Sequence, residues 1–574
     1  MNRLEKQNTG KRDVEMQRHA LCVKRISEME KVFPGREPSG EGAAERLGGL
    51  KGETISFQIA YYGDVGRKQY GTARIEAPAG VRVRVRQVGL APCAYPCHRE
   101  TDSGYLVTEP GMYPDILEEI GESGFPIVSG QWRSLWVDIE TAEDTPAGEY
   151  PINVILESQA FAPGMKPLYA RVDAVVEVID AKLPELELFH TEWLHCDCLA
   201  QYYGVEVFSR QHWEIIENFV RHAVKRGCNM LLTPVFTPPL DTAVNGERLT
   251  VQLVDVTVTD KGYVFGYDRF RRWVEMCGRC GIRYLEISHL FSQWGAKAAP
   301  KIMGWADGAE RRLFGWETRA DSKEYRDFLA AFLSSFSEEL EKYGIRERCF
   351  FHVSDEPTEE NLESYAYAKN LVRKYLPGDR VIDALSDYGF YEQGLVDEPV
   401  CANDQIDPFL KKRPPRLWIY YCTGQHLEVS NRFIALPGFR TRILGLQLYK
   451  YAIDGFLHWG YNFYNSDLSR YPINPYRSTD ADGAFPSGDP FLVYPGKDGK
   501  PVDSIRSMLM EKAMADLRAM RCLEKLTDRE TVLECLMEKE NGKITFRSFP
   551  QSIEYLVQTR ERINEAIRKQ KQAI

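Results

Sequence analysis

The sequence predicts an antiparallel β-sandwich followed by an α/β (β/α)8 barrel of the TIM type and a small C-terminal appendage. Short β-branched runs separated by turn residues follow one another from residue 52 to about residue 182, which is typical of an antiparallel sandwich. After residue 184, short apolar runs alternate with long amphipathic stretches, a pattern typical of parallel strands linked by helices. The predicted boundaries are a polar N-terminal arm at 1–35, the sandwich at 36–183, the barrel at 184–530 and the appendage at 531–574.

Each strand candidate beyond residue 184 is followed by a helical stretch or a long loop. The candidates are 186–193, 228–236, 282–291, 349–354, 380–385, 399–404, 416–421 and 455–463. Eight such units indicate a closed barrel. An open doubly wound sheet is the alternative, but a glycine-rich phosphate loop normally follows its first strand, and none is present here.

Charge and composition exclude several classes of partner. The 574-residue chain has a formal net charge of -10, whereas nucleic acids and anionic membranes need a dense basic patch. No apolar run reaches the length of about 18 residues that indicates a membrane span, and the N-terminal segment is charged throughout, unlike a secretory signal. Thirteen scattered cysteines suggest free thiols. We therefore expect a cytoplasmic protein with neither a nucleic-acid nor a membrane partner, of unknown oligomeric state.

The active sites of such barrels lie at the carboxyl ends of the strands. The residues at these ends mix carboxylates with aromatic rings, Asn and His, which suits a neutral polyhydroxylated ligand such as a small carbohydrate and not a polyphosphate. Some of them could equally be packing residues of the barrel. The candidate substrate-binding residues are His190, Glu192, Trp193, His289, Asp387, Tyr421, Trp459, Tyr461 and Asn462.

The sharpest local feature is FFHVSDEP at 350–357, where an apolar strand ends in two adjacent carboxylates. Hydrolysis of a glycosidic bond needs an acid at the leaving oxygen and stabilisation of positive charge at the anomeric carbon, so Asp355 and Glu356 are the catalytic candidates. Neighbours in a regular strand point to opposite faces. The pair can share a pocket only if the backbone bends, which Pro357 favours; the alternative is that both merely begin the next helix.

The segment HVSDEP, followed by DGFLHWGYNFYNS and by GDPFLVYPGKDGKPVDSIRSMLMEKAMADLRAM, resembles glycoside hydrolase family 123. The earlier WVDIETAEDTPAGEYPINVIL is similar to that family's N-terminal sandwich. The resemblance covers about residues 50–530, and the three segments in this order make it specific.

The resemblance implies a retaining exo-β-N-acetylhexosaminidase, with a β-N-acetylgalactosaminidase as the first expectation. In the substrate-assisted mechanism that it implies, the acetamido oxygen of the substrate attacks the anomeric carbon and forms an oxazoline. Glu356 would be the general acid and then the general base, and Asp355 would orient the acetamido nitrogen. Trp459 and Tyr461 would form an aromatic cage around the acetamido methyl group, and Tyr421 would donate to the acetamido oxygen.

Other interpretations stay open at this point. A glycosidase acting on a sugar without an acetamido group, or a carbohydrate-binding protein that lost the chemistry, would also fit the barrel. The run from His195 to Cys198 is a weak metal motif, and Cys277 with Cys280 is a weak redox pair because it ends a predicted helix. We expect neither a metal nor another cofactor.

Overall fold

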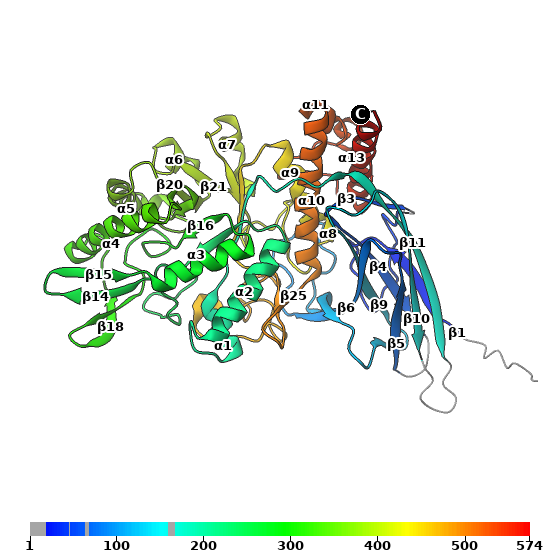
Figure 1. The fold of residues 1–574 in the computed structure, drawn as a ribbon, viewed down its shortest axis with the longest axis horizontal. Helices are drawn as coiled ribbons and strands as arrows, with labels where there is room; N and C mark the ends of the chain where they lie inside the picture. The colour runs from blue at the N-terminus through cyan, green and yellow to red at the C-terminus, as the bar shows by residue number, and fades with distance from the viewer. Residues whose placement is uncertain (1–18, 45, 64–67, 159–166, 574) are drawn as a thin grey trace, which may run out of the picture.

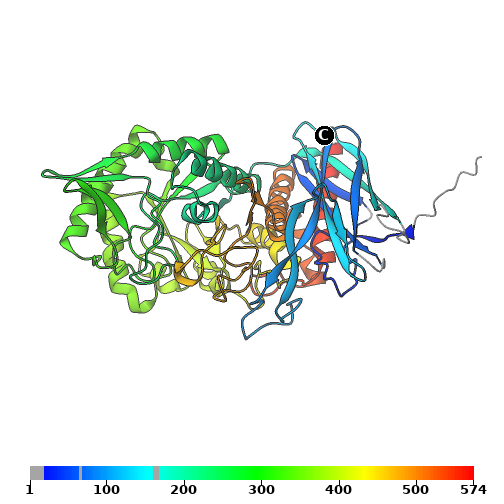
Figure 2. The same ribbon diagram turned by 90° about the horizontal axis from the view of Figure 1, so that it is seen from below.

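The computed structural model describes residues 19–44, 46–63, 68–158 and 167–573. A β-sandwich and a barrel lie side by side, and helix α10 (Ile505–Leu526) runs between them (Figure 1). Seen from below, the molecule is elongated along the line joining the two parts (Figure 2).

The sandwich consists of two sheets packed face to face. One contains β1 (His19–Ala20), β3 (Arg46–Lys51), β5 (Gln69–Glu76), β8 (Phe125–Ile127), β10 (Gly148–Ser158) and β11 (Leu168–Lys182). The other contains β2 (Cys22–Ile26), β4 (Thr54–Tyr62), β6 (Val81–Cys93), β7 (Gly111–Glu119) and β9 (Trp132–Thr141). Pairing is antiparallel except that β1 and β3 run parallel to β11. Inward-facing residues such as Ile59, Leu135 and Val154 are fully buried between the sheets, as alternation along each strand requires.

The N-terminal segment differs from the predicted arm at 1–35. Residues 1–18 lie outside the described part of the chain, but β1 and β2 each join a sheet. Gln58 fixes the chain after β2 by donating to the carbonyls of Ser27, Glu28 and Glu30. The sequence shows no alternation here, because β1 has only two residues and β2 carries two adjacent charged residues, Lys24 and Arg25. Main-chain pairing holds both strands in their sheets.

The predicted barrel is confirmed. Its strands close in chain order and all run parallel: β12 (Phe189–Glu192), β13 (Met230–Thr233), β16 (Tyr284–Ile287), β19 (Cys349–Phe351), β20 (Arg380–Leu385), β21 (Glu398–Ala402), β22 (Trp418–Tyr420) and β23 (Gly455–His458). Phe189 stacks on Trp418 inside, with ring centroids 5.2 Å apart. The interior is thus a packed core, as in other barrels of this kind.

Helices surround the barrel. They are α1 (Cys196–Tyr203), α2 (Arg210–Lys225), α3 (Asp268–Cys280), α4 (Lys323–Lys342), α5 (Leu362–Tyr375), α6 (Tyr388–Glu392), α7 (Asp407–Lys411), α8 (Gly438–Arg442) and α9 (Leu444–Lys450). The two longest, α2 and α4, begin at serine caps: Ser209 accepts from the His212 N–H and Ser322 from the Tyr325 N–H, which satisfies free N–H groups of the first turn. None of the helices in the described ranges is long and apolar enough to span a membrane.

Two hairpins that the sequence reading missed form a small additional sheet. They are β14 (Asp255–Thr259) with β15 (Gly262–Gly266), and β17 (Ile302–Ala306) with β18 (Ala309–Phe314). They project from the loops after β13 and β16 (Figure 1). Tyr263 and Phe265 pack on Phe328 of α4, which anchors the sheet beside the barrel.

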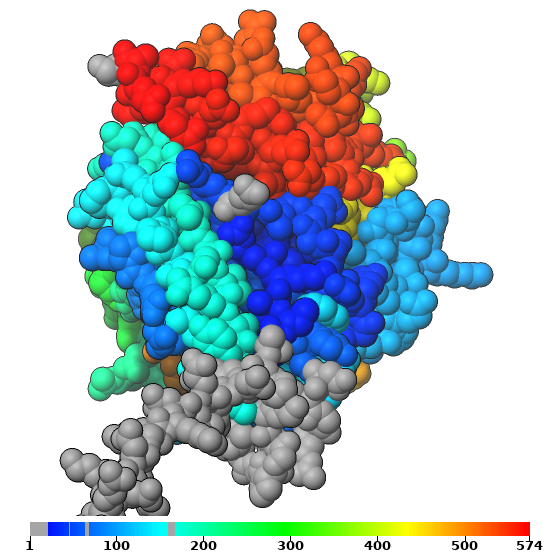
Figure 3. Space-filling model, turned by 90° about the vertical axis from the view of Figure 1, so that its right-hand side faces the viewer, coloured from blue at the N-terminus to red at the C-terminus, as the bar shows by residue number. Residues whose placement is uncertain are grey.

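The C-terminal segment packs on the sandwich. After the β24 (Tyr494–Pro495) and β25 (Pro501–Val502) ladder and α10 come α11 (Arg529–Glu534), α12 (Glu538–Asn541) and α13 (Ile553–Ala573). Figure 3 shows the C-terminal residues lying over the N-terminal sheets. Arg560 of α13 binds Glu53 at 2.5 Å, and Arg568 binds both oxygens of Glu177 at 2.9 Å. The segment predicted as an appendage therefore makes buried contacts with the first domain.

Candidate active site

The Asp355-Glu356 pair follows β19, whose last residue is Phe351. Glu356 has a φ of 43°, in the left-handed region that residues with a side chain rarely occupy. The Glu356 N–H donates to the Ala384 carbonyl at 3.2 Å, and the Trp294 N–H donates to the Asp355 carbonyl at 2.9 Å. These bonds hold the chain in a bend at Glu356, so the two neighbouring carboxylates line the same cavity.

The cavity has a volume of about 230 Å³ and lies at the carboxyl end of the barrel. Trp193, Ala384 and Leu457 are deeply buried members of its wall. Pockets for drug-sized ligands measure roughly 300–1,000 Å³, so this smaller cavity suits a single sugar ring. Besides these residues and the Asp355-Glu356 pair, the lining comprises Leu240, Asp241, Gln293, Trp294, Tyr420, Cys422, Thr423, Trp459 and Phe485.

Tyr420 is the direct partner of Glu356. The Tyr420 hydroxyl donates to Glu356 Oε1 at 2.7 Å and lies 3.3 Å from Ser386 Oγ. Burial raises the pKa of Glu356, and the Tyr420 hydrogen bond opposes that rise. A carboxyl group held in this way can keep its proton at a higher pH than usual, which a general acid requires.

Asp355 has its pKa raised well above the ordinary value, first by burial and then by the charge of Glu356. The positive charge of His352 opposes this rise. Two neighbouring acids cannot easily both ionise, so the Asp355-Glu356 pair should keep one proton to a higher pH than an isolated carboxyl group does.

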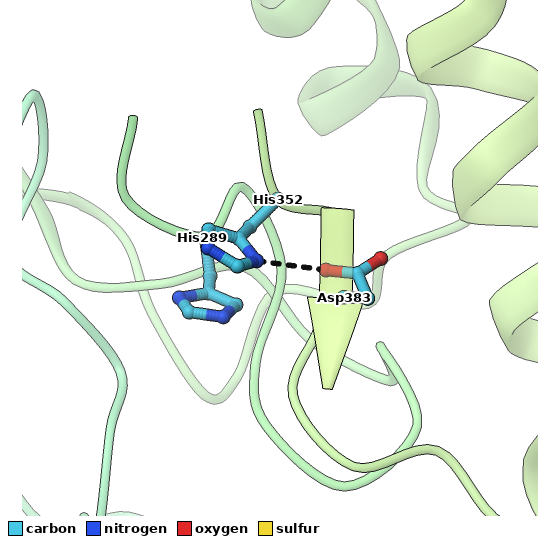
Figure 4. A group of neighbouring side chains, drawn as sticks. All are labelled: His289, His352 and Asp383. Atoms are coloured by element: carbon cyan, nitrogen blue, oxygen red, sulfur yellow. Dashed lines mark hydrogen bonds and ion pairs between the residues drawn. The ribbon is translucent and has the colours of Figure 1, made fainter. Parts of the chain in front are cut away.

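A buried cluster of Glu286, His352 and Asp383 lies beside the Asp355-Glu356 pair. His352 Nε2 donates to Glu286 Oε1 at 2.6 Å. His352 Nδ1 donates to Asp383 Oδ1 at 3.0 Å, the bond that Figure 4 draws. These bonds outweigh burial and raise the pKa of His352 to about 10, so the ring is an imidazolium. Other donors saturate the two carboxylates: Thr191 and Trp193 bind Glu286, and Tyr365 with the Val353 N–H binds Asp383.

His289 stacks on His352 with ring centroids 4.2 Å apart (Figure 4). It is buried, its two ring nitrogens have no hydrogen-bond partner, and burial lowers its pKa well below the ordinary value. His289, His352 and Asp383 are close enough to bind one ion. Both nitrogens of His352 already face carboxylates, however, so this residue has no free lone pair for a metal.

Of the predicted substrate-binding residues, Trp193 and Trp459 line the cavity. Trp193 is held by its bond to Glu286 at 2.7 Å. Trp459 Nε1 donates to Asp489 Oδ2 at 3.1 Å, and burial raises the pKa of Asp489 to about 7. The indole N–H groups are thus satisfied outside the cavity, and the rings form its walls.

The two predicted tyrosines lie elsewhere. The Tyr421 hydroxyl contacts Met510 Sδ of α10 at 3.4 Å, and the Tyr461 hydroxyl donates to the Phe219 carbonyl of α2 at 3.1 Å. Consecutive residues of a strand face opposite sides, so Tyr420 faces the cavity and Tyr421 the surrounding helices. Neither Tyr461, which was expected in the cage around the acetamido methyl group, nor Tyr421, which was expected to donate to the acetamido oxygen, lines the cavity.

His190 and Glu192 also differ from the expectation that they face the barrel mouth. Glu192 makes two bonds with the guanidinium of Arg432, at 2.7 and 2.9 Å, and His190 Nε2 lies 3.5 Å from Glu192 Oε1. Thr191 and Trp193 face the barrel interior, where both bind Glu286. His190 and Glu192 alternate with them and point to the other side, where Glu192 ties β12 to the segment around Arg432.

Asn462 and Asp387 have backbone partners. Asn462 exchanges two hydrogen bonds with the backbone of His195, at 2.8 and 3.1 Å. Asp387 caps α6 by accepting from the Gly389 N–H at 2.7 Å. Neither is among the residues that line the cavity.

The two cysteine motifs have other contacts. Asp197 forms a two-bond ion pair with Arg248 at 2.7 Å, and His195 Nε2 lies 2.9 Å from the Trp459 carbonyl. Burial raises the pKa of both Cys277 and Cys280, which makes them poor nucleophiles. All thirteen cysteines lie in the described part of the chain and are unpaired.

One whole wall of the cavity consists of residues that the sequence did not predict. Leu240 and Asp241 come from the loop after β13, and Gln293 and Trp294 come from the loop after β16. These residues lie beyond the strand ends, and nothing in their spacing points to a site. Tyr420 could have been found, since alternation from the apolar Trp418 places it inside.

Carboxylates with raised pKa values, in an aromatic-walled cavity at the mouth of a barrel, are typical of a glycoside hydrolase. The model of the glycoside hydrolase 123 catalytic domain matches residues 193–523. The chain therefore belongs to glycoside hydrolase family 123, and it is an enzyme of that class.

A solved structure with similar architecture supports the fold. A family 123 glycoside hydrolase from Clostridium perfringens, described in a study of glycolipid glycan hydrolysis, is similar over 96% of this chain and 98% of its own, with a TM-score of 0.71 and 14% identity. At that identity the likeness concerns the fold alone. A family 5 mannosidase from Rhizomucor miehei covers 60% of this chain and 96% of its own at 12% identity, with a TM-score of only 0.31. No curated protein matches the sequence.

Proposed function

We propose that the protein is a retaining exo-β-N-acetylhexosaminidase, with a terminal β-linked N-acetylgalactosamine as the first substrate to test. The observation that carries this proposal is the bend that turns two consecutive carboxylates, Asp355 and Glu356, into one small cavity. Retaining enzymes with a carboxylate nucleophile place their two carboxyl groups on either side of the anomeric carbon, about 5–5.5 Å apart. Consecutive residues approach from one side, which favours a nucleophile supplied by the substrate itself.

In the proposed first step, the acetamido oxygen attacks the anomeric carbon as the glycosidic bond breaks. Glu356 gives its proton to the departing oxygen, and the sugar becomes a cyclic oxazolinium ion that keeps its N–H, which donates to the Asp355 carboxylate. In the second step, Glu356 takes a proton from water while the water oxygen bonds to the anomeric carbon and the oxazolinium ring opens to the acetamido group. Two inversions give net retention, and Glu356 ends in its protonated form.

Substrate binding also sets the position of the shared proton. In the free protein, burial and the neighbouring charge raise the pKa of Asp355 well above normal, which would leave the proton on the wrong residue. The acetamido N–H donates to Asp355 and favours its ionised form, and His352 acts in the same direction. The proton then belongs to Glu356, at the leaving oxygen.

The cavity walls and the family relationship support this substrate class. Trp193 and Trp459 offer flat faces, which can pack against a sugar ring and an acetamido methyl group. The related Clostridium perfringens enzyme was described for glycolipid glycan hydrolysis, which supports a substrate derived from a glycan.

A panel of nitrophenyl β-glycosides tests the substrate. Turnover of the N-acetylgalactosaminide or the N-acetylglucosaminide, with strong inhibition by a thiazoline analogue of the oxazoline, is the expected result. Turnover confined to the galactoside and glucoside, without thiazoline inhibition, would contradict participation by an acetamido group.

The variant Glu356→Gln tests the acid. It should lose at least about 100-fold on alkyl glycosides or disaccharides, since general acid catalysis contributes about 10²–10⁴-fold. On an activated dinitrophenyl glycoside the first step needs no protonation, so the loss should be much smaller. Equal losses on both substrates would remove Glu356 from the acid role.

One observation favours a rival function. Asp241 is a third carboxylate lining the cavity, and burial raises its pKa to about 6. If Asp241 were a nucleophile, the enzyme would hydrolyse sugars without an acetamido group through a covalent intermediate. A 2-fluoro glycoside would then label Asp241, which mass spectrometry of the digested protein detects.

A further inference from the structure

One wall of the cavity has no part in the proposed chemistry. Two loops form it, and Gln293 holds them together: its Oε1 accepts from the Asp241 N–H at 2.6 Å, and its Nε2 donates to the Thr242 carbonyl at 3.3 Å. Leu240 and Trp294 present apolar surface on this wall. The wall is therefore a built surface that joins the loops after β13 and β16.

Trp294 is the most exposed aromatic residue of the cavity. Its side chain is 42% exposed, whereas Trp193, deep in the same cavity, is 2% exposed. An exo-acting enzyme buries the terminal sugar, and only the leaving group extends toward solvent. The position of Trp294 thus corresponds to the leaving group, and that of Trp193 to the terminal sugar.

The backbone holds Trp294 in a conformation that it would not choose freely. Its φ is 57°, and such strain persists only where the surrounding structure imposes it, commonly at functional sites. Ser364 of α5 donates to the neighbouring Gly295 carbonyl at 2.5 Å, and the Trp294 N–H binds the Asp355 carbonyl. The ring is therefore fixed relative to the Asp355-Glu356 pair.

We propose that Trp294 is the platform of a leaving-group subsite and stacks on the second sugar ring of the substrate. The inference rests on the proposed function. The carboxylate of Asp241, on the same wall, has a buried oxygen, Oδ2, without a hydrogen-bond partner. In this proposal, a hydroxyl group of the second sugar supplies the hydrogen-bond partner that Asp241 Oδ2 lacks. An aromatic face beside an unsatisfied acceptor suits a pyranose, which has an apolar face and hydroxyl groups at its edge.

The experiment measures how fast the wild type and each variant hydrolyse two substrates. One is a disaccharide with a β-linked N-acetylhexosamine at its non-reducing end, and the other is the preformed oxazoline of that sugar, which has no leaving group. Trp294→Ala should lower kcat/KM for the disaccharide about 10-fold, mainly through KM, because aromatic contacts of this kind contribute about that factor. Hydrolysis of the oxazoline should stay within about 2-fold, and Trp294→Phe should retain most disaccharide activity.

Trp305→Ala is the matched control, since Trp305 is 52% exposed but lies on β17, outside the cavity lining. It should change neither rate. Equal losses of Trp294→Ala on both substrates, or no loss on either, would overturn the subsite. If the wild type hydrolyses neither substrate, the proposed function fails, and calorimetric titration decides the subsite: weaker binding of the disaccharide but not of the monosaccharide to Trp294→Ala supports it, and unchanged binding of both overturns it.

Discussion

Tyr420 controls the acidity of Glu356 through a single hydrogen bond. The bond favours the ionised carboxylate and opposes the effect of burial. In Tyr420→Phe the pKa of Glu356 should therefore rise, and its acid form should persist to higher pH. The basic limb of the pH profile of kcat/KM for a disaccharide should move to higher pH.

Tyr421→Phe provides the control for this prediction. Tyr421 is the next residue, and its hydroxyl contacts Met510 outside the cavity. The pH profile of Tyr421→Phe should match that of the wild type. A similar displacement in both variants would mean that the shift arises from general loosening of the barrel and not from the bond to Glu356.

His352 should make the free energy of unfolding depend on pH. Its folded pKa of about 10 lies above the unfolded value, so the stabilisation is complete below pH 6.5 and is lost as the pH rises toward 10. His352→Gln should lower the free energy of unfolding at pH 6 by about 3–5 kcal/mol, because it leaves two buried carboxylates without their cation. Urea unfolding at several pH values measures both effects. A wild type whose stability is flat between pH 6.5 and 10 would contradict the imidazolium.

At the scale of elements, β23 begins at a glycine that the barrel interior requires. A Cβ at Gly455 would lie 2.1 Å from the Trp418 ring, which is stacked on Phe189 and cannot withdraw. Gly455→Ala should destabilise the protein by about 1–3 kcal/mol, as overpacking of a core does. Thermal unfolding measures the change.

Gly278→Ala is the matched control. Gly278 lies within α3, and a Cβ there meets nothing within 4 Å. The same substitution should stabilise this helix by about 0.5–1 kcal/mol. Destabilisation by both substitutions would show that the close approach at Gly455 is not the cause.

The elements also show what sequence can predict and what it cannot. The eight barrel strands follow from apolar runs between amphipathic stretches, and each observed strand overlaps its predicted range. Successive residues of a strand point to opposite faces, so an error of one position puts the wrong residue in the cavity. For this reason Tyr421 was expected where Tyr420 lies. The hairpin at 255–266 was missed because it interrupts a strand–helix unit, although its first strand, DVTVT, alternates polar residues with Val256 and Val258.

The candidate site was predictable to a similar extent. Asp355 and Glu356 were found because two acids end an apolar strand. The cluster around His352 depends on Glu286 and Asp383, whose strands bring them together only in the closed barrel. Trp294 and Asp241 come from loops whose shape no periodicity describes.

At the scale of the whole molecule, Asp503 joins the sandwich to the barrel. It lies just before α10 and binds Arg86 of β6 at 2.6 Å, Arg226 next to α2 at 2.6 Å and His222 of α2 at 2.7 Å. The arginines and His222 hold the pKa of Asp503 well below normal against the effect of burial. Its stabilisation is therefore present above the unfolded pKa near 4 and is lost as the pH falls further.

Asp503→Asn should uncouple the two parts of the molecule. It leaves Arg86 and Arg226 buried without this carboxylate, which typically costs about 3–5 kcal/mol, and the loss falls on the interface. We expect urea unfolding, followed by tryptophan fluorescence, to change from one transition to two, and limited proteolysis to cut between the sandwich and the barrel. Asp498→Asn removes an exposed ion pair with Lys500 and should change stability by less than about 1 kcal/mol. A single unshifted transition in Asp503→Asn would mean that the packing of α10 and α13, and not this ion cluster, couples the two domains.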